Sequence, residues 1–283
     1  MDVAEIPNED QAAHWNGRAG SAWTEAQPLL DALFEPIERM LADAAAALRP
    51  TSVLDVGCGT GSTTIAIARR LGAGGRAVGL DLSGPMLAVA RARAERDAAA
   101  AHFLRADAQT HAFEPDSFDL IVSRFGVMFF DDPVEAFSNL RHAAKRHAQL
   151  RCVVWRSAAD NPFMTTAEQA AAPLLPSPPA RDPDAPGQFA FADPERVKRI
   201  LADSGWADVD LRPIDPVCTM HEEDLTFYFT RLGPLGKILP DLDDVTRARI
   251  IETVRPAFAP FVQGTEVRFT AACWLVSASA SSH

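Results

Sequence analysis

The stretch Val53-Leu54-Asp55-Val56-Gly57-Cys58-Gly59-Thr60-Gly61 decides the fold of this 283-residue chain. Its first four residues resemble a buried strand that carries one acid, and a glycine then occupies every second position. Residues 62–71 follow with the pattern of a helix that ends at Gly72. Glycines let a backbone approach a ligand closely, and the free N–H groups of a helix start attract an anionic group. The stretch therefore predicts a strand, turn and helix start that together cradle a nucleotide-like ligand.

Strand and helix patterns alternate regularly over residues 51–156. Such alternation implies a parallel sheet covered on both faces, with ligands at the carboxyl ends of the strands. We therefore expect a doubly wound, Rossmann-like α/β fold. Before it, Pro36 is expected in the first turn of a helix that ends near residue 48. The expected strands are residues 53–56, 77–80, 102–105, 118–123 and 150–155.

The composition indicates a soluble, cytoplasmic protein that does not bind nucleic acid. The 27 Lys and Arg residues are outnumbered by 38 Asp and Glu residues, which gives a net charge of −11, whereas a phosphate backbone requires clustered cations. A neutral or cationic small molecule suits this surface, although acidity that serves solubility alone explains it equally well. No signal peptide or membrane-length apolar run is visible. The four cysteines are widely spaced, so neither a metal site nor a disulfide framework is expected.

Acidic residues narrow the choice of ligand. A dinucleotide site requires Gly-x-Gly-x-x-Gly, but Ser62 stands where the third glycine would fall. Asp55 precedes the glycines, and Asp81 ends the second strand, where a carboxylate can hold both ribose hydroxyls. Asp107-Ala108 follows the third strand, where a side-chain acceptor can hold an adenine amino group. These positions together indicate an adenosine that carries an amino-acid tail.

At this point the sequence resembles the class I S-adenosylmethionine-dependent methyltransferases, in particular the small-molecule group that includes the ubiquinone and menaquinone methyltransferases. The matching residues are Val-Leu-Asp-Val-Gly-Cys-Gly-Thr-Gly at 53–61, Gly-Leu-Asp-Leu-Ser at 79–83, Ala-Asp-Ala-Gln at 106–109, and Phe-Asp-Leu-Ile-Val-Ser-Arg-Phe-Gly-Val-Met-Phe-Phe at 118–130. One departure is Lys145–Gln149, where many relatives carry a Pro-Gly turn.

The resemblance implies S-adenosylmethionine as cofactor, S-adenosylhomocysteine as product, and a seventh strand that runs antiparallel between the fifth and the sixth. The alternating run Glu266–Ser277 suits that strand. The implied cofactor contacts lie in the leader and at the ends of the first four strands; they are Trp23, Asp55, Gly57, Cys58, Gly59, Gly61, Asp81, Leu82, Met86, Asp107, Ala108 and Ser123.

Six segments are expected along the chain: an N-terminal helical lid (1–50), a cofactor-binding core (51–156), a proline-rich irregular insertion (157–192), a core helix and strand (193–213), a helical cap insertion (214–265), and the last core strand with its tail (266–283). The leader contains Trp15 and Trp23, which are too apolar to lie idle in a polar segment. They either staple the leader to the core or close over a ligand.

Methyl transfer from a sulfonium is an in-line displacement, so the protein mainly aligns donor and acceptor and excludes water. A general base is needed only if an acceptor on oxygen, nitrogen or carbon must lose a proton. The catalytic candidates are His14, His111, Arg124, Asp131, Asp132 and Tyr228, although Asp132 is better explained as a helix cap. The residues expected to contact an aromatic or hydrophobic small-molecule acceptor, with a role in the lobe core as the alternative, are Phe130, Trp155, Arg156 and Tyr228.

Two other functions remain open at this point. A non-catalytic S-adenosylmethionine-binding subunit would show the same cradle without turnover. A NAD-dependent oxidoreductase would use a similar sheet, but the missing third glycine and Asp55 oppose it. A homodimer is compatible with the sequence.

Overall fold

The computed structural model describes residues 8–176 and 185–280, and its core is a seven-stranded sheet in the order β3-β2-β1-β4-β5-β10-β6. The first five strands in this order pair in parallel. Strand β10 (Cys273–Ala280) runs antiparallel between β5 (Ala144–Trp155) and β6 (Trp206–Ile214). The doubly wound fold with an antiparallel last strand is therefore confirmed. The other strands of this sheet are β1 (Ser52–Val56), β2 (Arg76–Asp81), β3 (Ala101–Arg105) and β4 (Phe118–Arg124).

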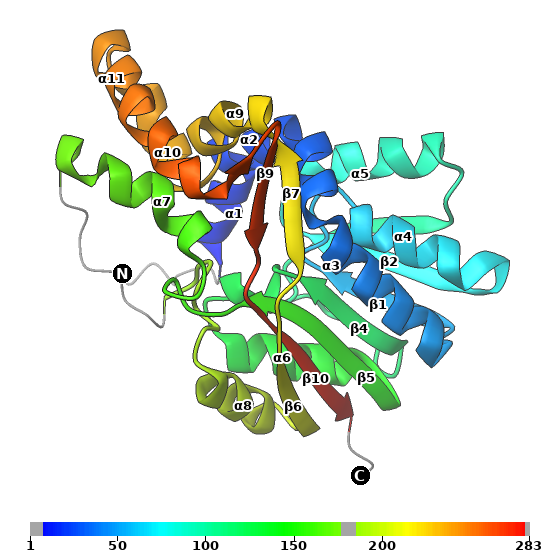
Figure 1. Cartoon of the computed structure of the whole chain (residues 1–283). Helices are drawn as coiled ribbons and strands as arrows, with labels where there is room; N and C mark the ends of the chain where they lie inside the picture. The colour runs from blue at the N-terminus through cyan, green and yellow to red at the C-terminus, as the bar shows by residue number, and fades with distance from the viewer. Residues whose placement is uncertain (1–7, 177–184, 281–283) are drawn as a thin grey trace, which may run out of the picture.

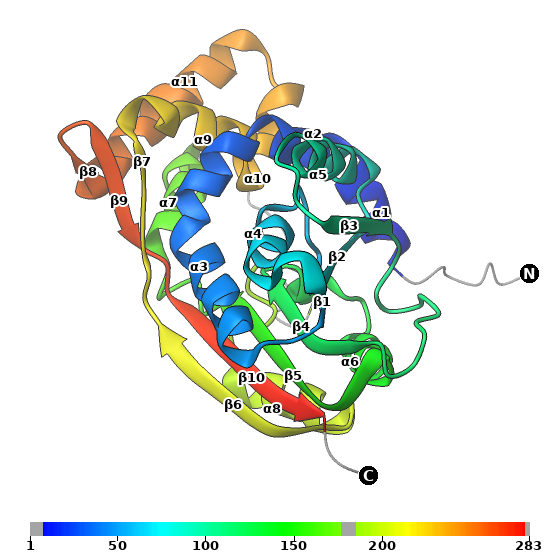
Figure 2. The same ribbon diagram turned by 90° about the vertical axis from the view of Figure 1, so that its right-hand side faces the viewer.

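Helices cover both faces of this sheet (Figure 2). Strand β1 is buried at every position because its alternating side chains meet a helix layer on either side. Val53 packs in a small apolar cluster with side chains of α3 and α4, whereas Leu54 belongs to the larger apolar cluster, which includes side chains of α3, α6 and α8. The helices around the sheet are α3 (Gln27–Leu48), α4 (Ser62–Leu71), α5 (Gly84–Arg96), α6 (Pro133–Ala143) and α8 (Pro194–Asp203).

Three of these helices begin at a residue whose side chain caps the helix. Ser83 Oγ accepts a hydrogen bond from the Met86 amide at the start of α5. Asp132 and Asp193 accept from backbone amides at the starts of α6 and α8. Each cap satisfies an N–H group that has no partner inside its helix. The interpretation of Asp132 as a helix cap is thereby confirmed.

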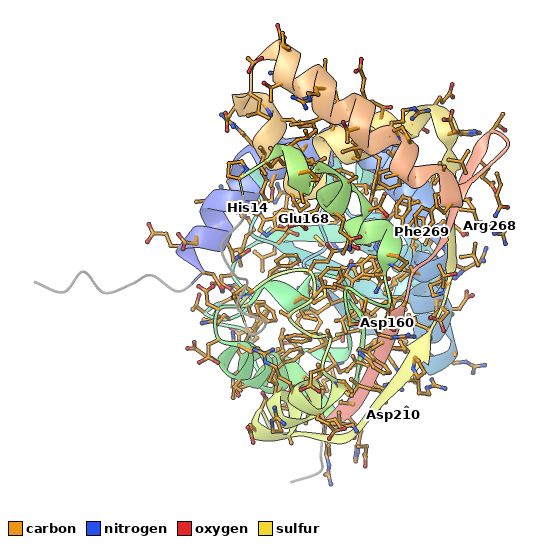
Figure 3. All side chains as sticks on the ribbon, turned by 60° about the vertical axis from the view of Figure 1, so that its left-hand side comes forward. His14, Asp160, Glu168, Asp210, Arg268 and Phe269 are labelled. Carbon is orange, nitrogen blue, oxygen red and sulfur yellow. The ribbon has the colours of Figure 1, made fainter. Side chains whose placement is uncertain are left out.

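A smaller lobe lies above the carboxyl ends of the parallel strands (Figure 1). Its centre is aromatic: Phe163 stacks on Phe269 at 3.9 Å, and Phe229 stacks on Phe258 at 5.7 Å. Figure 3 labels Phe269 on its strand. The lobe is built from α7 (Pro162–Ala171), α9 (Leu225–Arg231), α10 (Gly233–Ile238), α11 (Asp244–Val254) and a three-stranded antiparallel sheet of β7 (Val217–His221), β9 (Glu266–Thr270) and β8 (Val262–Gln263).

The single strand predicted over Glu266–Ser277 is wrong, because the chain leaves one sheet for the other at Ala271 and Ala272. Strand β9 pairs with β7 in the small sheet, and only β10 lies in the core sheet. Asn161, which is 1% exposed, stabilises the break. Its Oδ1 accepts from the Ala272 amide at 2.9 Å, and its Nδ2 donates to the Ala272 carbonyl at 3.0 Å. The Ala272 carbonyl also accepts from the Arg156 amide at 3.0 Å, so the Asn161 side chain supplies the one partner that the Ala272 N–H needs.

Three other expectations differ from the structure. Pro36 lies inside α3 rather than in its first turn, and the helix continues through it because buried side chains on both sides anchor it to the core. The insertion 157–192 is not irregular throughout, since α7 occupies part of it; residues 177–184 lie outside the described residues. The cap insertion 214–265 includes strand β7 as well as helices. Within residues 8–176 and 185–280, no helix is both long and apolar enough to cross a bilayer.

Candidate functional site

The glycine turn between β1 and α4 approaches the end of β4 too closely for side chains. Gly57 and Gly61 have φ values of +66° and +83°. A Cβ atom on Gly57 would lie 2.6 Å from the Gly126 Cα atom, and one on Gly61 would lie 2.8 Å from the Ala90 Cβ atom. The amides of Gly57 and Cys58 both donate to the Leu80 carbonyl, which ties the turn to the end of β2. Both the backbone conformation and the space therefore require glycine.

Asp55 lies at the end of β1 with one carboxylate oxygen unpaired. The residue is 1% exposed, and its Oδ2 accepts a hydrogen bond from Thr64 Oγ1 at 2.6 Å. Among the described residues, Oδ1 has no hydrogen-bond partner. Burial raises the pKa of this carboxyl to about 7, against the lowering effects of the Thr64 hydroxyl and the positive charge of Arg124. A buried acceptor without a donor is costly, so the site suits a ligand that brings a donor or a positive charge.

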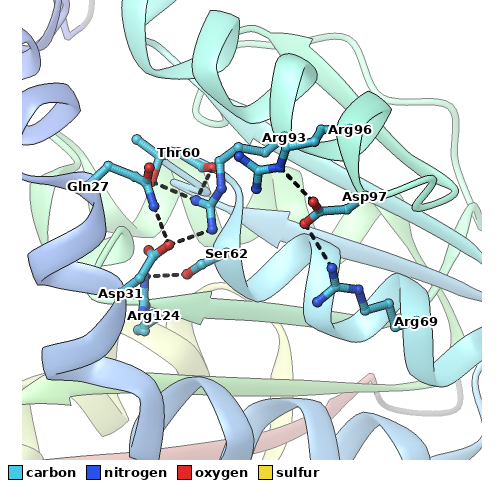
Figure 4. Close-up of polar contacts among 9 residues, drawn as sticks. All are labelled: Gln27, Asp31, Thr60, Ser62, Arg69, Arg93, Arg96, Asp97 and Arg124. Carbon is cyan, nitrogen blue, oxygen red and sulfur yellow. Dashed lines mark hydrogen bonds and ion pairs between the residues drawn. The ribbon is translucent and has the colours of Figure 1, made fainter.

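Arg124 is the complementary group at the end of β4. Its Nη2 donates to Ser62 Oγ at 2.8 Å in the first turn of α4 (Figure 4). Its guanidinium lies 6.0 Å from the ring centre of Phe34. The buried Nη1 finds no acceptor in the part of the chain that the structure describes. One carboxylate oxygen of Asp55 and one guanidinium nitrogen of Arg124, both unpaired among the described residues, thus flank the start of α4.

Asp81 is held by backbone amides on both oxygens. Its Oδ2 accepts from the Gly59 amide at 2.7 Å and its Oδ1 from the Ser83 amide at 2.8 Å. Burial raises the pKa of Asp81, and these amide hydrogen bonds oppose the shift. Each carboxylate oxygen has a second lone pair, so the orientation is fixed while capacity for two further donors remains.

Asp107 follows β3 and meets a residue from the leader. Asn8 Nδ2 lies 2.9 Å from each oxygen of the Asp107 carboxylate. Asn8 Oδ1 accepts from the Asp131 amide at 2.9 Å, and the Asn8 amide donates to Asp131 Oδ2 at 2.6 Å. Asn8 is 2% exposed. The leader is therefore anchored on one of the predicted cofactor contacts.

The rest of the leader forms α1 (Glu9–Asn16) and α2 (Arg18–Glu25), which lie beside the start of α5. Asn16 Oδ1 accepts from the Gly84 amide at 2.9 Å, and Ser83 Oγ donates to the Trp15 carbonyl at 2.7 Å. The Trp15 ring packs edge-on against Trp23 at 5.8 Å and Phe129 at 5.3 Å. The two tryptophans thus join the leader to the segment that follows β4.

The remaining predicted cofactor residues lie around the same strand ends. Met86 is 4% exposed, and a Cβ atom placed on Gly59 would lie 3.7 Å from the Met86 sulfur. Ala108 is also buried. Leu82 presents its carbonyl to Asn16 Nδ2. Ser123 Oγ donates to the Val56 carbonyl at 2.7 Å and accepts from the Gly126 amide, so its side chain joins β4 to β1.

Each of the four predicted acceptor contacts has partners of its own in the structure. Trp155 is 4% exposed and stacks on Phe125 at 4.6 Å. Arg156 forms ion pairs with Asp160 and Asp215. Phe130 packs on Phe137. Tyr228 lies in the smaller lobe, where its hydroxyl donates to the Met164 sulfur at 3.3 Å and burial raises its pKa.

The two candidate histidines also lie apart from each other. His111 packs edge-on against Phe113 at 4.7 Å, just beyond β3. His14 lies on α1 (Figure 3), where burial and the positive charge of Lys237 lower its pKa. Among the described residues, no three His, Cys, Asp or Glu side chains gather as a metal site.

The sequence interpretation missed the polar residues that secure the site from outside. Arg93 of α5 donates to Asp31 of α3 at 2.5 Å and to the Thr60 carbonyl at 2.8 Å, and Gln27 donates to the same Asp31 oxygen (Figure 4). Asn8 was missed as well. Apart from the pair Gln27–Asp31, which lies within one helix, these contacts join residues 33 to 123 positions apart, and no local pattern could have indicated them.

Comparison with known proteins agrees with this geometry. Residues 53–147 match the family described as methyltransferase domain. The chain is 36% identical over 103 residues to a demethylmenaquinone methyltransferase from Lactiplantibacillus plantarum, across 36% of this chain and 44% of that protein. It is 34% identical over 106 residues to an aklanonic acid methyltransferase from a Streptomyces species, across 37% and 48% of the two chains. The chain thus spans less than half the length of these curated relatives.

Among solved structures, the YcgJ protein from Bacillus subtilis superposes with a TM-score of 0.57 at 17% identity, across 87% of this chain and 98% of that chain. This likeness concerns the fold. Residues 53–147 match a methyltransferase domain, within a chain whose fold resembles that of this solved structure.

Proposed function

We propose that this protein is a methyltransferase that transfers a methyl group from S-adenosylmethionine to a small-molecule acceptor by in-line displacement. One observation carries the proposal: Asp55 Oδ1 and Arg124 Nη1 are both buried and unpaired among the described residues, beside the first turn of α4. The amino-acid tail of the cofactor has an ammonium group and a carboxylate. Each can pair with the oppositely charged side chain and remove the cost of leaving it unpaired.

In this proposal the chain mainly binds and orients. Asp81 holds the ribose hydroxyls with the lone pairs that Gly59 and Ser83 leave free, and Asp107 with Ala108 meets the adenine edge. Gly57, Cys58, Gly59 and Gly61 allow the backbone to approach the tail, and Ser123 lies beside it. Leu82 and Met86 flank the adenine, and Trp23 closes over the ligand. The bound cofactor supplies an electrophilic methyl group, so the protein needs to align the acceptor and exclude water.

The acceptor is proposed to be a small aromatic or hydrophobic molecule. Partly exposed aromatic side chains at Trp23, Phe129, Phe130 and Tyr228 support this class, since such side chains favour planar apolar ligands. Two relatives are named for demethylmenaquinone and for aklanonic acid, and these names also support an aromatic or hydrophobic acceptor. If the acceptor must lose a proton, His14 is the preferred base of the leader because its lowered pKa keeps it neutral near pH 7.

Calorimetric titration with S-adenosylhomocysteine tests the cofactor assignment. Arg124→Met keeps most of the side-chain volume but removes the charge, and it should weaken binding about 10- to 100-fold, the worth of a hydrogen bond between charged groups. Arg96→Met is the matched control, because Arg96 is an exposed arginine of α5 that pairs with Asp97. Equal affinities of the wild type and Arg124→Met would contradict the assignment.

Turnover is tested separately by release of S-adenosylhomocysteine across a panel of phenols, quinols, amines and carbon acids. Release with one acceptor class names the methylated atom. Tight cofactor binding without release across the panel would favour a non-catalytic binding subunit. Stabilisation by NADH in a thermal-shift assay, without binding of S-adenosylhomocysteine, would favour an oxidoreductase.

A further inference from the structure

The leader occupies groups that the cofactor is proposed to use. Asn8 is joined to the end of β3 through Asp107 and to the loop after β4 through Asp131. A weaker contact, 3.2 Å from Asn8 Nδ2 to Gln109 Oε1, completes its surroundings. Because Asn8 is 2% exposed, this is a built contact rather than a surface encounter.

The amide of Asn8 presents the same hydrogen-bonding pattern as an adenine edge. Adenine places an amino donor beside a ring-nitrogen acceptor, and asparagine places an NH2 donor beside a carbonyl acceptor. At Asn8 the donor meets the Asp107 carboxylate and the acceptor meets the Asp131 amide. The Asn8 side chain thus offers Asp107 what the adenine amino group would offer.

We propose that Asn8 competes with the adenine of the cofactor for Asp107, so that the leader must release Asp107 before the cofactor can bind fully. This inference rests on the proposed function, which assigns Asp107 to adenine. Ligand binding that requires a minor, leader-released state has an apparent affinity reduced by the fraction of that state. The leader is then a gate at the end of the site where the adenine is proposed to bind. Weakening the contact between Asn8 and Asp107 should therefore strengthen cofactor binding.

The rest of the leader determines how far release can spread. Asn16 and Trp15 hold the far end of α1 on Gly84 and Ser83, beside the β2 end rather than on Asp107. Arg18 of α2 pairs with Asp241 of the smaller lobe at 2.8 Å, but both side chains are more than 60% exposed, so this pair adds little. Asn8 is therefore the contact at which adenine and leader exclude each other.

Two substitutions test the competition by calorimetry with S-adenosylhomocysteine. Asn8→Ala removes the amide, and Asn8→Gly does so while suiting the φ of +56° at this position. Asn8 makes no side-chain cap to α1, so neither change removes a helix cap. Both variants should bind about five- to tenfold more tightly than the wild type. The matched control Arg18→Ala, which loosens the leader elsewhere, should stay within about twofold.

Unchanged or weakened binding in both Asn8 variants would overturn the proposal, since it would mean that Asn8 supports Asp107 instead of competing for it. Hydrogen exchange gives an independent readout: with S-adenosylhomocysteine bound, amides at the Asn8 end of α1 should exchange faster than in the ligand-free wild type, and slower exchange there would refute the gate. A wild type that does not bind S-adenosylhomocysteine at all would overturn the proposed function together with this inference, and the affinities of the wild type and variants distinguish the two cases.

Discussion

Replacing Asp55 with asparagine should remove the pH dependence of cofactor binding. Asp55 is buried, its pKa is raised from 3.8 to about 7, and its Oδ1 has no donor among the described residues. The cationic amino group of the ligand binds the ionised carboxylate, so the apparent affinity is proportional to the fraction of protein molecules in which Asp55 is deprotonated. With a pKa of about 7, that fraction rises from roughly 3% at about pH 5.5 to half at about pH 7, which strengthens binding roughly 15-fold.

The assay is calorimetric titration with S-adenosylhomocysteine across this pH range. Asp55→Asn keeps an acceptor for the Thr64 hydroxyl, so the fold should persist while affinity falls and loses its pH slope. Asp97→Asn is the control, because the neighbouring Arg96 holds the pKa of Asp97 below its ordinary value and that carboxylate stays ionised throughout. A wild-type affinity that does not change over this range, or an Asp55→Asn variant with the wild-type slope, would refute the role given to Asp55.

The raised pKa of Asp55 makes the stability of the ligand-free protein fall as the pH rises, although cofactor binding strengthens over the same range. The folded-state pKa of Asp55 lies above the unfolded value, so the folded chain binds this proton more tightly. The free energy of unfolding of the ligand-free protein should therefore fall as pH rises from about 4 to about 7, by as much as about 4 kcal/mol for a shift of three units. Asp55→Asn should flatten this dependence in urea titrations, and an unchanged profile would contradict the shift.

Two further predictions concern the fold. Asn161→Ala should lower the free energy of unfolding by about 2 kcal/mol, because it leaves the buried amide of Ala272 without a partner, whereas the Ala272 carbonyl still accepts from the Arg156 amide. Urea unfolding measures this, and a loss below about 1 kcal/mol would show that the break between β9 and β10 does not need Asn161. His147→Gly should raise the free energy of unfolding by about 0.5–1 kcal/mol. The exposed His147 has a φ of +66°, a conformation that costs a residue with a side chain about 1–2 kcal/mol. Glycine removes this cost, but its greater freedom in the unfolded chain offsets part of the gain. His142→Gly, in the last turn of α6, should instead destabilise by about 1 kcal/mol, and a gain there would undermine the backbone argument.

The sequence predicted the core of the fold because its decisive features are local. Apolar strand runs, the glycine spacing and the caps at Ser83, Asp132 and Asp193 each depend on residues within a few positions of one another. At Lys145–Gln149, where the sequence departs from the Pro-Gly turn of many relatives, β5 begins at Ala144 directly after α6, and His147 has a left-handed conformation. The errors fell where neighbours in space decide, as at Pro36 inside α3 and at Asn161 beside Ala272.

The sequence by itself determined the sheet, its glycine turn and the acids at the strand ends, since parallel strands that end in such residues bring them to one edge. Only the tertiary structure decided which of those groups already have partners. It left Asp55 Oδ1 and Arg124 Nη1 unpaired among the described residues, gave each oxygen of Asp81 one backbone amide donor, and placed the Asn8 side chain on Asp107. Hydrogen bonding saturates and acts over about 3 Å, so whether a carboxylate is free for a ligand depends on contacts between segments that are distant in the chain.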